Sequence, residues 1–214
     1  MHVLALLCHP VRSSFCGSVL DRYARGLVTA GHTVEVADLY RERFDPVFHA
    51  EDYVQFEGGR MPPDVLAEQA RVDRCDALSF ITPVWWLGMP AMLKGWFDRV
   101  WSNGWAYEFS NNPEGSLLRK RPFVFLLTAG GSRGTYRDYR YDVALDTIIR
   151  VGMLDWCGVA ESTVALLHDT GFDAVATNDH LDYAEELGRT VLSAGPFTPP
   201  SRSITIMHGP TARP

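Results

Sequence analysis

Apolar residues along the chain gather in five short runs, and each run is followed by a loop and then by apolar positions at helical spacing. The strands are predicted at Val3–Leu7, Thr33–Leu39, Ala77–Ile81, Phe123–Thr128 and Val159–Leu167. The helices are predicted from Phe15 to Val28, from Asp64 to Cys75, over Pro90–Trp101, over Val143–Cys157 and near Asp179–Leu192. Continuous apolar strands are typical of a sheet that is buried on both faces.

Strands that alternate with helices pair in parallel through right-handed crossovers, so the pattern predicts an α/β fold with a doubly wound parallel sheet. Five strands favour the order 2-1-3-4-5, which places a ligand crevice between strands one and three. We expect a single domain over residues 1–194. The proline-rich stretch 195–214 loses the periodicity, and we expect an extended tail there, either disordered or lying on a partner subunit.

Composition narrows the functional classes. Of 214 residues, 46% are hydrophobic and 21% charged, as in ordinary globular proteins, and the net charge of −6 argues against nucleic-acid binding. No apolar run approaches the length of a membrane span, and no HxH or HExxH spacing indicates a catalytic metal. The four cysteines lack CxxC spacing, so we interpret them as reduced, mostly buried thiols of a cytoplasmic protein.

The loop after the first strand, His9–Cys16, leads straight into a helix that Ser13 or Ser14 is expected to cap and Gly31 to end. Backbone N–H groups at a helix start, together with serine hydroxyls, suit a phosphate. The loop matches neither GxGxxG nor GxxxxGK[ST], which disfavours a dinucleotide Rossmann site or an NTPase. A capped helix with nothing bound is the alternative.

The loop after the third strand contains two adjacent tryptophans, Trp85 and Trp86, between two prolines. We expect Trp96 and Trp101 to lie in the core, on the buried face of the following helix. Trp85, Trp86 and Trp105 instead suggest a rigid aromatic platform for a flat ligand or for a partner surface.

The loop after the fourth strand, Thr128–Tyr136, is glycine-rich. Gly130 and Gly131 allow the backbone to approach a ligand and to point N–H groups at it, and Tyr136 supplies a phenol. Alone, this loop is better explained as a flexible turn. The three loops open at one edge of the sheet, and together they predict a site for a phosphorylated planar heterocycle.

These segments resemble the NAD(P)H:quinone oxidoreductases of the flavodoxin-like fold, a group that includes flavin-binding ancillary subunits of bacterial potassium efflux systems. The resemblance is carried by His9–Cys16, by Asp76-Ala77-Leu78, by the block from Pro83 to Val100, by Gly104-Trp105-Ala106-Tyr107 and by Thr128–Tyr136. It implies a homodimer with FMN or FAD in each site. It also implies ping-pong transfer of two electrons from NAD(P)H to a quinone-like acceptor.

The resemblance also implies roles by position. The cofactor-binding set would be His9, Ser13, Ser14, Phe15, Cys16, Pro83, Val84, Trp85, Trp86, Leu87, Thr128, Gly130, Gly131 and Tyr136. Gly130, Gly131 and Tyr136 would also serve catalysis, by stabilising negative charge on the reduced ring. Trp105, Tyr107 and Phe109 would belong to the substrate pocket and reach across the dimer interface.

One position departs from the long eukaryotic relatives, which pair the tyrosine with a histidine six residues later, where this chain has Asp142. A carboxylate there disfavours a proton-relay role unless Arg137 or Arg140 compensates its charge. Residues 119–121, Arg-Lys-Arg, are interpreted as a solvated loop rather than a site for the NADPH 2′-phosphate. A flavin-binding regulatory subunit of a membrane transport system and an electron-carrier flavoprotein remain the alternative functions.

Overall fold

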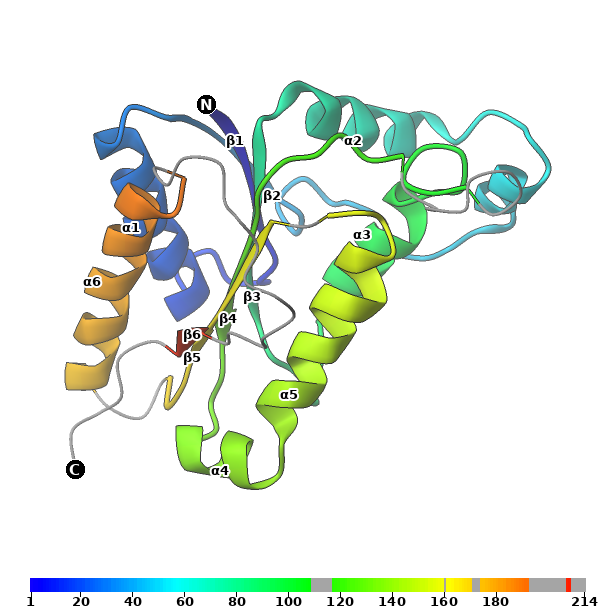
Figure 1. Cartoon of the computed structure of the whole chain (residues 1–214). Coiled ribbons are helices and arrows are strands. Elements are labelled where there is room, and N and C mark those ends of the chain that lie inside the picture. Colours follow the sequence, from blue (N-terminus) through cyan, green and yellow to red (C-terminus); the bar gives the residue numbers. More distant parts are fainter. Residues whose placement is uncertain (109–116, 160, 171–173, 193–206, 209–214) are drawn as a thin grey trace.

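The structure is a computed structural model that describes residues 1–108, 117–159, 161–170, 174–192 and 207–208. A parallel sheet lies between two layers of helices, with α1 and α6 against one face and α2, α3 and α5 against the other (Figure 1). No helix in these described ranges combines the length and the apolar character that crossing a bilayer requires. The predicted α/β architecture is confirmed.

The strands are β1 (His2–Leu7), β2 (Thr33–Asp38), β3 (Ala77–Pro83), β4 (Phe123–Thr128), β5 (Ser162–Leu167) and β6 (Met207–His208). Their order is β2-β1-β3-β4-β5-β6, and all neighbours pair in parallel, so the predicted five-strand order is confirmed. The sixth strand was not predicted. It lies within the segment expected to be a tail and extends the sheet beside β5. The predicted boundary at residues 194 and 195 lies outside the described residues.

The helices are α1 (Phe15–Thr29), α2 (Pro63–Arg74), α3 (Ala91–Val100), α4 (Arg133–Asp138), α5 (Tyr141–Asp146) and α6 (Ala174–Thr190), with a 3₁₀ helix η1 (Ala50–Phe56) and a π-helix η2 (Thr147–Asp155). Sequence periodicity missed η1 and α4, which are six or seven residues long and too short to show a helical repeat. The helix predicted over 143–157 corresponds to the end of α5 together with η2. The π-helical turns of η2 are wider than α-helical turns, so its apolar residues recur at a different spacing.

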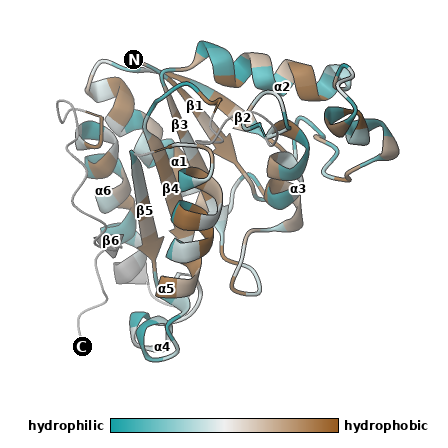
Figure 2. Ribbon diagram, turned by 45° about the vertical axis from the view of Figure 1, so that its right-hand side comes forward, coloured by the Kyte–Doolittle hydropathy of each residue, from teal (hydrophilic) through white to brown (hydrophobic). Residues whose placement is uncertain are grey.

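Each face of the sheet has its own apolar core, and the strands between the helices are strongly hydrophobic (Figure 2). The face under α3 is aromatic: the Phe80 ring stacks on Phe125 with centroids 4.6 Å apart and meets Trp96 edge-on. Trp96 and Trp101 are buried, as predicted. The four cysteines are free and buried, which confirms their interpretation as core thiols.

A buried arginine on α3 anchors the long connection between β2 and α2. Arg99 is 3% exposed and donates to both carboxylate oxygens of Asp52, which is 0% exposed, at 2.9 and 3.1 Å. It also donates to Asp64 at 2.6 Å and to the Asp45 carbonyl at 2.8 Å. The same connection passes so close to α3 that a side chain at Gly95 would meet the Pro46 carbonyl oxygen at 2.0 Å. The connection therefore follows the surface of α3.

We expect Arg99→Met to lower the free energy of unfolding by about 3–5 kcal/mol, because it leaves the buried Asp52 carboxylate without its cation. Urea unfolding measures this loss. Lys94→Met is the matched control: Lys94 lies on the same helix and forms an exposed ion pair with Asp98, so its loss is expected to stay below about 1 kcal/mol. Equal losses in the two variants would contradict the anchoring role.

Candidate functional site at the carboxyl edge of the sheet

Three loops meet at the carboxyl edge of the sheet, as the topology predicts. Backbone hydrogen bonds join the strand ends from which they start: Cys8 N–H donates to the Ile81 carbonyl at 3.0 Å, and Val84 N–H donates to the Thr128 carbonyl at 2.8 Å. Ala129 N–H then donates to the Leu167 carbonyl at 2.8 Å. The loops after β1, β3, β4 and β5 are therefore held in fixed order along one edge.

The first loop presents the N-terminus of α1. Ser14 is the N-cap and accepts a hydrogen bond from Gly17 N–H, so one of the two serines expected as a cap is confirmed in that role. The N–H groups of Phe15 and Cys16 come first in the helix and have no intrahelical acceptor. The first turn of α1 carries no acidic side chain, and Ser13 is exposed beside it. This donor set fits a phosphate.

Cys16 connects the first loop to the third. Its thiol lies 3.0 Å from the Thr128 hydroxyl in a buried contact, and burial raises the pKa of the Cys16 thiol to about 11. Phe15 packs its ring against His180 of α6, with centroids 6.3 Å apart. The loop start is therefore held by contacts on two sides, and Cys16 serves packing rather than thiolate chemistry.

Residues 85–88 form a tight hairpin at the end of β3. Trp85 and Gly88 exchange two backbone hydrogen bonds of 3.1 and 3.0 Å, which leaves Trp86 and Leu87 at the tip. Both tip residues have left-handed backbone, with φ of 51° and 56°, the geometry of a type I′ turn. The Trp86 side chain is fully exposed, and Trp85 meets the His9 ring edge-on at 6.0 Å. The hairpin thus presents an aromatic surface on a strained backbone.

The glycine loop leads into α4, and the single buried residue of α4 is Tyr136. Ser132 caps the helix by accepting from Thr135 N–H at 3.1 Å. A side chain at Gly131 would meet Cε2 of Tyr136 at 2.9 Å, so the tyrosine ring packs directly on the glycine backbone. Burial raises the pKa of Tyr136, which keeps its phenol protonated at neutral pH.

His168, which directly follows β5, was missed by the sequence analysis. It is 2% exposed, and its ring contacts Tyr136 edge-on with centroids 4.9 Å apart. His180 Nε2–H donates to the His168 carbonyl at 2.7 Å, and Asp169 N–H donates to the Gly131 carbonyl at 3.2 Å. The one sequence feature that points to His168 is its position at the end of a predicted strand. The turn after β5 therefore supports both the tyrosine and the glycine loop from behind.

Trp105 and Tyr107 lie at the opposite, amino edge of the sheet. Trp105 Nε1 is 3.4 Å from the carboxylate of Asp73, in the last turn of α2, while Tyr107 pairs through its backbone with Asn103, just after α3. Within one chain, Trp105 and Tyr107 therefore lie away from the three loops at the carboxyl edge. Phe109, predicted with them, lies outside the described residues.

Residues 119–121 also lie at the amino edge, and the expectation of a wholly solvated loop is wrong for Arg121. Its guanidinium is buried and donates to the carbonyls of Val72 and Cys75, which end α2. A cation is favourable there because the helix dipole is negative at its C-terminus. Arg119 pairs with Asp76 at 3.0 Å. Neither arginine reaches the crevice.

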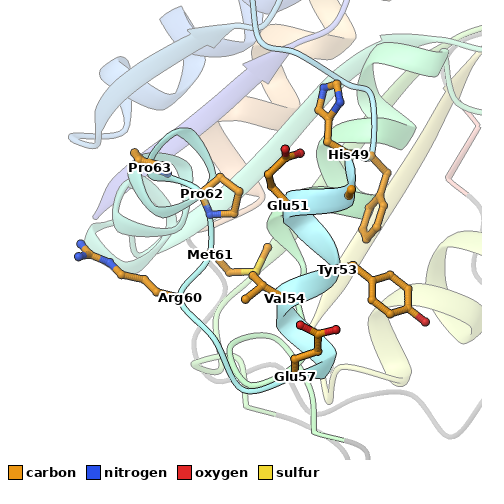
Figure 3. A pocket seen from close by; sticks show the side chains of 11 residues that line it. His49, Glu51, Tyr53, Val54, Glu57, Arg60, Met61, Pro62 and Pro63 are labelled. Carbon is orange, nitrogen blue, oxygen red and sulfur yellow. The ribbon is translucent and has the colours of Figure 1, made fainter.

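A cavity of about 1110 Å³ lies away from this edge, between η1 and residues 60–63. Figure 3 shows Val54 and Met61 pointing toward one another there, with Tyr53, Glu57 and Arg60 around them. His49, at the start of η1, lies 2.7 Å from the Asp45 carboxylate, and this hydrogen bond raises the pKa of the exposed imidazole. The cavity shares no lining residue with the three loops.

A family model described as flavodoxin-like fold matches residues 1–190. An uncharacterized NAD(P)H oxidoreductase of Haemophilus influenzae is 30% identical over 171 residues, which cover 79% of this chain and 84% of that protein. NAD(P)H dehydrogenase (quinone) 1 of Cavia porcellus is 30% identical over 175 residues, 72% of this chain and 64% of that protein. The structure of an NAD(P)H:quinone oxidoreductase from Methanothermobacter marburgensis superposes with a TM-score of 0.81 at 35% identity, covering 89% of this chain and 98% of that one.

We expect the pKa of His49, followed by NMR, to lie above the ordinary value of about 6.5 and to fall toward it in Asp45→Asn. Because the folded pKa is raised, the pair contributes stability below about pH 6.5, and this is lost as pH rises through the folded value. His32 is the internal reference: burial, aided by the N-terminal charge, lowers its pKa, and that pKa should be the same in both proteins. An unchanged His49 pKa in Asp45→Asn would contradict the pairing.

Gly131→Ala is expected to displace the Tyr136 ring and to destabilise the fold by about 1–3 kcal/mol, since the new methyl group overlaps the ring. Near-UV circular dichroism reports the ring, and urea unfolding reports the stability. In the control Gly134→Ala, three residues along, the nearest atom is Ser132 Oγ at 3.7 Å. That variant should be neutral or more stable by up to about 1 kcal/mol. Identical behaviour of the two would show that Gly131 is not a packing constraint.

Proposed function

Because the chain belongs to the flavodoxin-like fold family that includes NAD(P)H:quinone oxidoreductases, we propose that it is a flavin-dependent NAD(P)H dehydrogenase that reduces a quinone-like acceptor by two electrons. The observation that carries the proposal is the meeting of three loops at one sheet edge. One suits a phosphate, one presents aromatic surface and one presents backbone N–H groups. The four buried free thiols support a cytoplasmic location.

The α1 N-terminus would hold the flavin phosphate through the N–H groups of Phe15 and Cys16 and the Ser13 hydroxyl, with His9 beside it. This donor set suits the phosphate of FMN and that of FAD equally. When bound, the flavin supplies the chemistry, accepting a hydride from NAD(P)H and passing two electrons on.

The hairpin and the glycine loop would hold the flavin ring between them. Pro83, Val84, Trp85, Trp86 and Leu87 would line its face and edge. The N–H groups of Gly130 and Gly131 and the Tyr136 phenol would hydrogen-bond the edge where negative charge develops. These donors lie on a backbone fixed by Asp169 and Thr170 N–H groups, so they need little rearrangement as that charge appears.

Asp142 does not replace the histidine of the eukaryotic relatives as a proton relay in this proposal. Its carboxylate is buried and accepts a hydrogen bond from Val143 N–H at 2.8 Å, at the start of α5. Arg137 pairs with Asp138, and within the described ranges no ion pair joins Asp142 to Arg137 or Arg140. The Tyr136 phenol therefore acts as a fixed hydrogen-bond donor.

Donor and acceptor would use the same exposed face in turn, which is a ping-pong order. The fully exposed Trp86 offers a flat surface to either ring. We further propose a homodimer, because Trp105 and Tyr107 lie at the far edge of their own chain and can join a crevice only in a second copy. Phe109 would accompany them.

The test is a visible spectrum of the purified protein after flavin addition, followed by anaerobic NADPH or NADH and then by steady-state turnover with a naphthoquinone. We expect a bound flavin band that bleaches on donor addition and is restored by the quinone. Tyr136→Phe should lower the rate of bleaching by about 10-fold to 100-fold through loss of a hydrogen-bond donor.

Tyr139→Phe is the control, because Tyr139 is 69% exposed and its ring stacks on Tyr141 rather than on the glycine loop. Its rate should equal that of the unchanged protein. Bound flavin without turnover on quinone, azo or nitro acceptors would overturn the enzyme proposal and favour the regulatory-subunit reading. Absence of any flavin binding would overturn both.

A further inference from the structure

The carboxyl edge carries a concentration of arginine that contrasts with the acidic chain. The net charge of the protein is −6, yet residues 133–140 contain three arginines and one aspartate. This segment is α4 with the turn that ends it, and it follows directly on the glycine loop. Figure 1 shows α4 at the end of the sheet opposite to α2. Positive charge is therefore concentrated in the segment that follows the glycine loop.

Arg133 and Arg140 flank the buried tyrosine along the chain. Arg133 lies three residues before Tyr136 in α4, and side chains at this separation are neighbours on a helix surface, whereas Arg140 follows just after α4 ends. Tyr136 is buried while Arg133, Arg137 and Arg140 are exposed. Arg140 has a left-handed backbone with φ of 58°, which ends this helical direction and starts α5. Arg133 and Arg140 therefore lie within four residues of Tyr136, in the segment that follows the glycine loop.

Among the described residues, ion pairs distinguish Arg133 and Arg140 from Arg12 and Arg137. Arg137 is paired with Asp138, and at the same sheet edge Arg12 is paired with Asp21. Arg133 and Arg140 form no ion pair with any residue that the structure describes. At the opposite edge, by contrast, Arg71 contacts three glutamates. Two exposed guanidinium groups beside the crevice are therefore available to an anion.

We propose that Arg133 and Arg140 bind the phosphate groups of the dinucleotide donor, so that α4 is a phosphate subsite for NAD(P)H beside the crevice. This inference rests on the proposed function. A guanidinium binds phosphate through two parallel hydrogen bonds, which a dinucleotide offers at its pyrophosphate and NADPH also at its 2′-phosphate. A donor with its nicotinamide in the crevice carries these groups outward, over the neighbouring loops. The local positive charge offsets the repulsion between an anionic donor and an acidic protein.

The experiment compares donors that differ only in phosphate. Arg133→Gln/Arg140→Gln is assayed with a fixed, uncharged naphthoquinone and with NADPH, NADH or dihydronicotinamide riboside, which has no phosphate. We expect the KM for NADPH to rise about tenfold or more, the loss of at least one charge-assisted hydrogen bond. The KM for the riboside and kcat for all three donors should stay unchanged. A larger rise for NADPH than for NADH places the contact on the 2′-phosphate, and an equal rise places it on the pyrophosphate.

Arg74→Gln is the matched control, since Arg74 is an exposed arginine in the last turn of α2 at the other edge. Its donor KM values should equal those of the unchanged protein. Equal rises for the riboside and NADPH would mean a structural defect and overturn the proposal. The acceptor is tested in the same way. If the double variant raises the KM for a sulfonated azo acceptor and leaves the donor KM values unchanged, the arginines bind the acceptor, and the proposal is overturned.

A binding measurement keeps this test independent of turnover. Calorimetry with adenosine 2′,5′-bisphosphate on the flavin-loaded protein is expected to give about tenfold weaker binding in the double variant. If no donor reduces the unchanged protein, the proposed function fails, whereas the calorimetry still decides whether these arginines bind phosphate. Unchanged affinity in the double variant would overturn the subsite.

Discussion

The buried charge of Arg99 is the constraint on which much of this architecture depends. A guanidinium almost without solvent must have carboxylate partners, and these are Asp52 of η1, inside the long connection, and Asp64 in the first turn of α2, where that connection ends. That connection is thereby tied to α3 and cannot drift into solvent. The hairpin of residues 85–88 stands between β3 and the start of α3, so a firmly anchored α3 also fixes the platform at the crevice.

The strands could be predicted almost residue by residue because their apolar runs are continuous and their ends are marked by turn residues. The observed β4, Phe123–Thr128, has the predicted bounds, and the other strands of the predicted five differ by at most three residues at an end. Local periodicity cannot reveal features that depend on distant contacts. η1 is held by Arg99 of another helix. β6 is a strand because it pairs with Ala165 and Leu166 of β5. The short pair Met207–His208 has no pattern of its own.

The candidate site, like the fold, can be predicted from the sequence only in part. Its three loops follow from topology, since strand order alone decides which loops share an edge. The left-handed tip at Trp86 and Leu87 does not follow, because type I′ turns usually carry Asn-Gly and neither residue is present. The block from Pro83 to Val100 carried the resemblance, and much of it proves to be packing. Trp96 fills the core, and Gly95 admits the Pro46 carbonyl. A family signature can thus report how a site is supported as well as what it binds.

The burial of all four thiols has a chemical consequence under the proposed function, in which the acceptor is a quinone. Quinones are electrophiles that alkylate thiolate, and thiolate rather than thiol is the reactive form. Burial raises the pKa of Cys8 to about 12 and those of Cys16 and Cys157 to about 11, and it also raises the pKa of Cys75. The thiolate fraction of the first three at neutral pH is therefore about 10⁻⁴ or less. Under the proposed function, such burial would protect the chain from arylation by the acceptors that it reduces.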